Sequence, residues 1–332
     1  MRRQPWSVAP GLRKEAPTIN FVFEVNYAVF SVFASMLITE VAGSVFLLFF
    51  WQAAKAKVLD YIVPIWEVTG TFGAFWVVTS YFAYPGLLIP AASIFAGLIV
   101  VFLILFVGRN ASIVFGEFIT KRRWLDEKKL YKAYAVSTLL LGVVVLVLLS
   151  SLVSGAGVNL GAGTFSLGAW VSSPGSIPFV VGVLLIVVGM GTVFFSLTTL
   201  RKATVPVTAL GVVVSVASFY LYSSALVSAW VAFPIILTFV AVLPFLSDRT
   251  AAIVSNKAVF IALLSIIIFT LQFLVYPSVI GRPGVSVDSV TTTGPVASAY
   301  EAITAVGTPL LAVMLAFYVT IVRRGNSAAP PL

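Results

Sequence analysis

The chain has 332 residues, of which 60% are hydrophobic and 9% are charged, and its formal net charge is +9. It contains no histidine, no cysteine and only four methionines, so it has almost no side chain that could ligate a haem, a copper ion or an iron–sulfur cluster. The lack of cysteine also excludes disulfide and thiol chemistry. We therefore expect no cofactor to be bound by this chain, and any redox metal to belong to a partner.

Apolar runs about as long as a lipid bilayer is thick recur from one end of the chain to the other. A hydrocarbon core of about 30 Å requires about 20 apolar residues in a helix, and these runs do not alternate as the strands of a membrane barrel do. The sequence therefore predicts an all-α polytopic membrane protein with about nine transmembrane helices. In chain order, the predicted helices span residues 26–51, 60–83, 87–107, 132–153, 178–199, 204–224, 227–247, 257–279 and 297–322.

A Gly- and Ser-rich stretch without charges follows the fourth predicted helix and divides the series. The division predicts two four-helix bundles plus a peripheral helix. Trp170 lies within this stretch and is expected to form an aromatic foot at the membrane interface. The expected regions are an external N-terminal tail (1–25), a first four-helix membrane bundle (26–153), an external loop (154–177), a second membrane bundle with the final helix (178–324) and a cytoplasmic tail (325–332).

The positions of lysine and arginine predict the orientation, because these residues concentrate in the cytoplasmic loops of membrane proteins. Assigning the loops alternately to two sides puts fifteen of the twenty basic residues on one side, with Arg109 counted in the loop after the third helix. A multi-pass protein of the cell membrane with an external N-terminus and a cytoplasmic C-terminus is expected. This topology accounts for the net positive charge, so we expect contacts with membrane lipids and no nucleic-acid partner.

Small residues at helical spacing favour close packing between helices. Two groups of glycines show this spacing within the predicted helices. They are Gly70 and Gly73 in the second helix, and Gly182, Gly189 and Gly191 in the fifth.

Two glutamates lie deep within predicted helices, where a charge costs several kcal/mol unless it faces a partner or water. Glu40 is about 11 residues, or roughly 16 Å, from the cytoplasmic end of the first helix. Glu67 is about 7 residues, or roughly 10 Å, into the second helix from the same side. Adjacent antiparallel helices can bring the two within reach of each other. Glu301 is expected at the membrane interface and Glu117 in a cytoplasmic extension of the third helix.

Two interpretations of these acids remain open. Two carboxyls in sequence, with bound water, can form a short proton relay from the cytoplasm. Alternatively, each is a hydrogen-bonded packing residue, Glu40 beside Thr39 and Glu67 beside Thr69.

The surroundings of Glu67 carry a resemblance to a known family. The segment Pro64–Glu67 leads through small and aromatic residues to Tyr84-Pro85, and it resembles the second helix of subunit II of cytochrome bd-type quinol oxidases, where a Pro-x-Trp-acid sequence has this place. Thr39-Glu40 lies where that family carries a Thr-Asp pair. The resemblance extends over about 26–324 through an ordered set of features in the second half: Trp230–Pro234, Leu243-Pro244, Asp248-Arg249, Phe273–Pro277, Tyr318 and Arg323-Arg324.

The chain also departs from the family pattern. Val68–Phe72 replaces a Gly-Asn-Gln-x-Trp segment, and Glu67 replaces an aspartate. Ala42–Val45 stands where typical members have Phe-Asp-x-Gly, which leaves one acid instead of two in the first helix. The resemblance is therefore to a short, divergent member, and the polar lining of its proton path differs.

The resemblance implies a role for the chain within a respiratory complex. Subunit II of that family is the haem-free partner that scaffolds subunit I and contributes a proton path from the cytoplasm, while subunit I holds haem b and haem d. Quinol is then oxidised by the complex, and a structural quinone in this chain is a further expectation. On this basis the proton path is expected to use Glu67 first and Glu40 second, with Trp66, Thr69 and Thr39 as supports.

Two other classes remain as alternatives. One is a haem-free, quinone-binding membrane anchor of a molybdenum or iron–sulfur oxidoreductase, which would need a soluble iron–sulfur partner. The other is a secondary transporter, for which helices broken at matching positions in the two halves are expected. Pro234, Pro277 and Pro309 do not pair convincingly with prolines of the first half.

Overall fold

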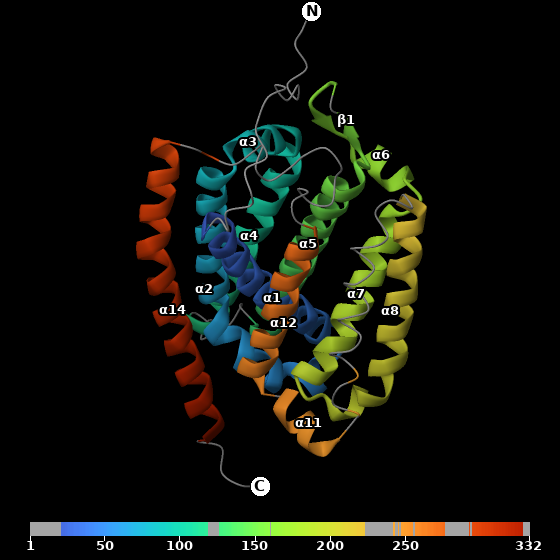
Figure 1. Ribbon diagram of the computed structural model, residues 1–332. Coiled ribbons are helices and arrows are strands. Elements are labelled where there is room, and N and C mark those ends of the chain that lie inside the picture. Colours follow the sequence, from blue (N-terminus) through green and yellow to red (C-terminus); the bar gives the residue numbers. More distant parts are fainter. Residues whose placement is uncertain are drawn as a thin grey trace, which may run out of the picture.

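The computed structural model describes residues 21–118, 126–159, 161–222, 247–254, 256–275 and 294–327, with 242, 245 and 292 as single residues. Most of these residues are helical, and the long helices run up and down between two ends (Figure 1). One end carries a short β-hairpin, and the opposite end carries α11 (Asp248–Val254). We refer to them as the hairpin end and the α11 end.

The first half of the chain forms five helices. Asp126 precedes the last of them and accepts a hydrogen bond from the backbone N–H of Lys128 (3.1 Å), which satisfies one of the free donors of the first turn. The same helix ends at Gly155, whose φ of 78° suits a residue without Cβ. The five helices are α1 (Phe21–Phe49), α2 (Trp51–Ala83), α3 (Pro85–Ile94), α4 (Ala96–Phe118) and α5 (Glu127–Ser154).

The second half begins with the hairpin, in which Val158 pairs with Phe165 and Asn159 with Thr164. Its strands are β1 (Val158–Asn159) and β2 (Thr164–Phe165). Then follow α6 (Leu167–Ser172), α7 (Ser176–Phe194), the 3₁₀ helix η1 (Thr198–Leu200), α8 (Arg201–Tyr222), α11, α12 (Lys257–Val275) and α14 (Pro295–Ser327).

Trp170 does not form the interfacial foot that the sequence predicted. It lies on α6 with only 5% of its surface exposed, and its indole N–H donates a hydrogen bond to Ser150 Oγ of α5 (2.9 Å). A buried indole needs such an acceptor. The loop between the two halves therefore folds onto the helices and is held there by Trp170.

Seven of the described helices are long and apolar enough to cross a membrane, which confirms a multi-pass all-α membrane protein. They are α1, α2, α4, α5, α7, α8 and α14. The predicted helix 257–279 corresponds to α12, which is apolar but shorter in its described part. Apart from 242, 245 and 247, the predicted helix 227–247 lies outside the described residues, and so does the motif Trp230–Pro234. Nine helices therefore stay a prediction.

The third predicted helix, 87–107, has the wrong bounds. The chain breaks at Phe95 into α3 and α4, and the long spanning helix is α4, which continues to Phe118. Pro85 occupies the first turn of α3 and Pro90 lies inside it, so the apolar run contains residues that weaken one continuous helix. The charge count assumed that Arg109 lies in a loop. This assumption is wrong, because Arg109 lies within the transmembrane helix α4. Glu117 lies in the last turn of α4, as expected.

Helix α1 occupies the centre of the molecule. It packs against α2 and α5 of the first half and against α7 and α12 of the second (Figure 1). Its buried face includes Met36 and Phe46, both fully buried. The two halves therefore share α1 in their core, and the division into two four-helix bundles stays a prediction.

Glycines permit close approach at several helix contacts. On α2, a Cβ added to Gly73 would lie 2.7 Å from the ring of Phe33 in α1. Gly70 differs, because its nearest neighbour would be Phe106 at an ordinary 3.7 Å. Three glycines of α7 likewise leave no room for a Cβ: Gly182, Gly189 and Gly191. The packing role is confirmed for all of these except Gly70.

Candidate functional site

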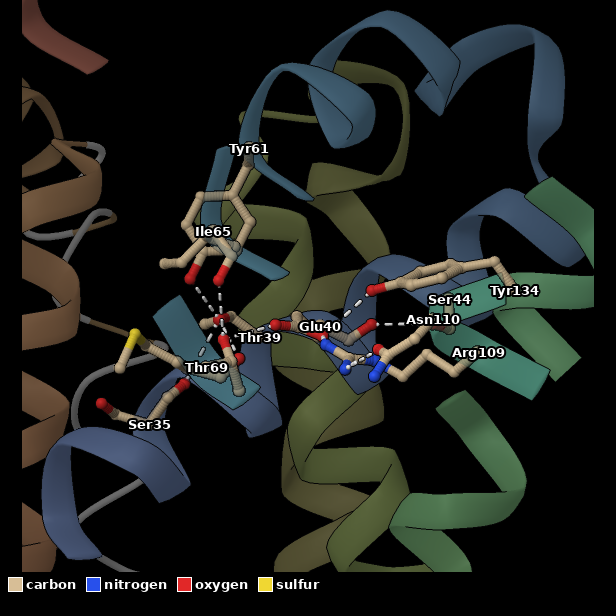
Figure 2. A network of polar contacts seen from close by, with 11 residues as sticks. Ser35, Thr39, Glu40, Ser44, Tyr61, Ile65, Thr69, Arg109, Asn110 and Tyr134 are labelled. Atoms are coloured by element: carbon tan, nitrogen blue, oxygen red, sulfur yellow. Dashed lines mark hydrogen bonds and ion pairs between the residues drawn. The ribbon is translucent and has the colours of Figure 1, made fainter. Parts of the chain in front are cut away.

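The carboxyl group of Glu40 lies at the centre of a buried polar network that joins four helices (Figure 2). Glu40 itself, on α1, is 0% exposed. Thr69 of α2 donates a hydrogen bond to Oε1 (2.5 Å), and Tyr134 of α5 donates one to Oε2 (3.0 Å). Arg109 of α4 forms an ion pair with the same Oε2 through Nη2. One carboxyl thus receives donors from three neighbouring helices.

Arg109 is the cation of this network, and it is only 2% exposed. Its second terminal nitrogen, Nη1, donates to Asn110 Oδ1 (3.0 Å). The guanidinium lies 5.6 Å from the ring centre of Tyr134 and 5.8 Å from that of Phe106. A guanidinium is always charged in proteins, so burying it requires a counter-charge. Glu40 is the side chain that supplies this charge.

A second arm of hydrogen bonds leads from the neighbouring residue towards α12. Thr39 and the hydroxyl of Tyr61 on α2 lie 2.7 Å apart, and Thr39 also donates to the carbonyl of Met36 (2.7 Å). One turn earlier on α1, Ser35 Oγ lies 2.8 Å from Ser265 Oγ of α12. These hydroxyls keep their bonds within the chain, as buried polar groups require. They fix α1 against α2 and α12 on the side away from Arg109.

Glu67 has different surroundings, although it lies on α2 only two residues before Thr69. Two residues turn a helix by about 200°, so Thr69 points inward to Glu40 while Glu67 points outward. The side chain of Glu67 is exposed and lies in a groove of about 440 Å³ on the lateral face between α2 and α4. The groove is lined by Trp66, Glu67, Gly70, Thr71, Ala74, Phe106 and Asn110.

Asn110 links the groove to the buried network. It forms part of the groove lining, and it accepts the hydrogen bond from Arg109, which in turn pairs with Glu40. The two glutamates therefore do not meet directly. Glu67 and Asn110 both line the groove, and Arg109 joins Asn110 to Glu40 in the interior. The buried Glu40–Arg109 ion pair thus supplies fixed charges in the interior, while the carboxyl of Glu67 is accessible in the groove.

The structure tests how the sequence grouped the site residues. It places Glu40, Thr39 and Thr69 in one network, but Thr69 supports Glu40 and not its neighbour Glu67. Trp66 does lie beside Glu67, as a wall of the groove.

Sequence reasoning missed Arg109 and Tyr134. The apolar residues Ile113–Phe115 that follow Arg109 are the signal that the helix continues past it. Tyr134 lies among apolar residues seven positions into its helix and left no such signal. In the described part of the chain, no three acidic, histidine or cysteine side chains are grouped to hold a metal ion.

Comparison with known proteins gives one informative result. No protein-family model matches the sequence, and no curated protein matches it. Among solved structures, the chain is similar to one in the structure of bd oxidase from Geobacillus thermodenitrificans, with a TM-score of 0.63 and 17% sequence identity. The match covers 90% of this chain and 97% of that chain. The fold is therefore that of a multi-pass membrane chain of a bd oxidase.

Proposed function

We propose that this chain is the haem-free subunit II of a membrane quinol:oxygen oxidoreductase of the cytochrome bd type. The observation that carries the proposal is the likeness in fold to a bd oxidase chain over nearly the full length of both. It is joined by the absence of histidine, which leaves this chain without the usual axial ligand of haem. The chain therefore scaffolds a partner, subunit I, which holds haem b and haem d and brings about quinol oxidation and oxygen reduction.

The orientation belongs to the same proposal. The α11 end faces the cytoplasm, because α2 and α8 begin near it (Figure 1) and their first two turns carry the basic residues Lys55, Lys57 and Arg201. The N-terminus is then external and the C-terminus cytoplasmic. Glu67 lies about 10 Å beyond Asp60, deeper into the membrane along α2.

The chain's own chemistry in this proposal is a proton path from the cytoplasm. Glu67 is the group that exchanges the proton, because its carboxyl is exposed in the groove between α2 and α4. Glu40 is the second member of the path, held by Arg109, Tyr134 and Thr69. The ion pair behind the groove gives the site a fixed field, which does not need to reorganise when a proton moves. Trp66 restricts the space around Glu67 and Thr39 anchors the adjacent turn of α1.

Purification of the native complex tests the proposal. The membrane complex isolated through this chain is expected to show the absorbance of b- and d-type haems, while the chain expressed alone shows neither. A copurifying iron–sulfur subunit without these haems would contradict the proposal and support a quinone-binding anchor. Quinone extraction from the isolated chain tests the expectation of a structural quinone separately.

A further inference from the structure

Helix α6 has one buried side and one exposed apolar side. Trp170 points inward and bonds to Ser150 of α5. Leu167 and Val171, by contrast, are 53% and 48% exposed. These two residues are four positions apart, so they lie on the same side of the helix. The described part of the chain therefore leaves one side of α6 uncovered, and this side is apolar.

The contacts of α6 place it at the level where spanning helices end. Ser150, which accepts the hydrogen bond from Trp170, lies in the apolar span of α5, Glu127–Leu152. Helix α7 begins at Ser176, four residues after α6, and Tyr222 at the end of α8 donates a hydrogen bond to Ser176 Oγ (3.2 Å). Helix α6 is therefore fixed beside the hairpin-end termini of α5, α7 and α8 (Figure 1).

The surface next to α6 is apolar and carries no charge. From residue 133 to residue 200 the chain contains no acidic or basic residue. Ile177 and Val181 are exposed on the first two turns of α7. Tyr220 and Leu221 are exposed on the last turn of α8, where an exposed tyrosine is typical of a membrane–water interface. Helix α6 therefore adjoins a surface that has the composition of a lipid-facing one.

The hairpin that precedes α6 has the opposite character. The residues described in its turn are exposed and small or polar, and Asn159 Oδ1 accepts a hydrogen bond from the backbone N–H of Ala162 (3.0 Å). Ser166 caps the start of α6, because its Oγ accepts a hydrogen bond from the backbone N–H of Ala169 (3.3 Å). A segment in contact with lipid must satisfy its backbone groups internally, which a helix does and an open turn does not. The hairpin turn therefore suits water, and α6 suits the edge of the bilayer.

We propose that α6 is an interfacial helix whose exposed side binds the acyl chains of phospholipids. Leu167 and Val171 lie in the leaflet at the hairpin end, at the boundary between headgroups and acyl chains, where such helices bury their apolar side by about 5–10 Å. Acyl chains are the partner that fits, because this side of α6 offers apolar contact and no charge with which a headgroup could pair. Trp170 holds the helix at this depth through its bond to Ser150. The inference concerns this chain alone and does not depend on the proposed function.

Site-directed spin labelling tests the depth of α6, because the chain has no cysteine of its own. Leu167→Cys on α6 is compared with Ala162→Cys in the hairpin turn and Val213→Cys on α8, which are all exposed positions. Each variant is purified in the complex, labelled with a nitroxide and reconstituted into vesicles of phosphatidylcholine and phosphatidylglycerol. The wild-type complex, treated in the same way, gives the background.

Collisions of the label with oxygen, which enters lipid, and with a water-soluble nickel chelate measure its depth. The label at Leu167 is expected to meet oxygen several-fold more often, and nickel several-fold less often, than the label at Ala162. It is expected to lie less deep than the label at Val213. If nickel reaches Leu167 as easily as Ala162, α6 lies in water. If neither reagent reaches it, protein covers α6. Either of these two results overturns the inference.

A second pair of variants tests whether contact with lipid holds α6 in place. Leu167→Asp puts a carboxyl on the side that faces lipid, and Ala162→Asp puts the same group in the hairpin turn. A nitroxide on Val171→Cys reports the mobility of α6 in vesicles. Leu167→Asp is expected to increase this mobility, because a charge at an apolar boundary is costly, while Ala162→Asp leaves it unchanged. Identical spectra for the two Asp variants would contradict the inference.

Discussion

Glu40 and Glu67 are two glutamates of the same membrane region with opposite surroundings. Glu40 is fully buried and is held by Arg109, Tyr134 and Thr69. Glu67 is exposed in a lateral groove, and α2 turns it away from that network. The comparison teaches that depth in the membrane does not define the role of an acid. The surroundings matter as well, because three donors hold the carboxyl of Glu40 in place, whereas the carboxyl of Glu67 is exposed in the groove.

The largest effect is expected from removing the counter-charge of Glu40. Arg109→Met leaves a buried carboxylate without its cation, which typically costs about 3–5 kcal/mol in the free energy of unfolding. Denaturant unfolding of the purified chain in detergent measures the loss. The double variant Glu40→Leu/Arg109→Met removes both charges and is expected to recover most of it, because two apolar groups of similar size need no partner. If the double variant is as unstable as the single one, Arg109 does not stabilise the fold by compensating the charge of Glu40.

Glu67→Gln tests the other side of the comparison. The amide keeps a hydrogen-bond acceptor but cannot carry a proton at ordinary pH, so the complex is expected to assemble while oxygen-linked proton uptake slows by about 10²-fold. Glu67→Asp keeps the carboxyl and is expected to be milder. Oxygen consumption and proton uptake by the purified complex measure both variants. Unchanged turnover in the Gln variant would remove Glu67 from the proton path.

Tyr134→Phe probes one donor of the buried site and leaves the charge pair in place. The variant removes the 3.0 Å hydrogen bond to Glu40 Oε2 without opening a cavity. A hydrogen bond to a charged group contributes about 1.5–3 kcal/mol, so a loss near the lower value is expected while Arg109 remains. Thermal unfolding of the variant beside wild type gives the comparison. Tyr220→Phe on the exposed surface of α8 is the matched control and should unfold as wild type does.

The smallest effects are expected from two glycine variants that lie on different faces of α2. Gly73→Ala places a Cβ against the ring of Phe33, 2.7 Å away, and is expected to lower the unfolding free energy by about 1 kcal/mol. Gly70→Ala faces the groove and is expected to be neutral or slightly stabilising, because alanine favours a helix by about 1 kcal/mol over glycine. Denaturant unfolding of both variants under the same conditions measures the two changes in unfolding free energy. A larger loss for Gly70→Ala than for Gly73→Ala would contradict the assignment of the two faces.

The class of the fold could be predicted from the sequence, because a helix that spans a lipid bilayer requires a run of about 20 apolar residues. Such runs are visible from composition alone. The sequence located Glu40 and Glu67 for the same reason, since charges are rare in such segments. It could not predict which way each side chain points, because the apolar residues surround these helices on all sides and leave little amphipathic signal. Thr69 illustrates the limit: it lies two residues from Glu67 in sequence, but it donates a hydrogen bond to Glu40, 29 residues away.

Arg109 illustrates a second limit. A basic residue followed by a polar one predicts a loop, and the positive-inside count used it in that way. In the structure, the acid of α1 compensates its charge, so α4 continues past it. Only the pairing of the two residues, 69 positions apart, makes either acceptable in its helix. A pattern confined to one segment does not contain that information.

The distance along the chain between these two residues has a consequence for biosynthesis. Helix α1, which carries Glu40, is synthesised before α4, and the ribosome makes Arg109 69 residues after Glu40. At roughly 5–20 residues per second, this interval lasts roughly 3 to 14 s. During that time Glu40 has no counter-ion. A nascent chain that ends before α4 therefore cannot form the final arrangement of these helices.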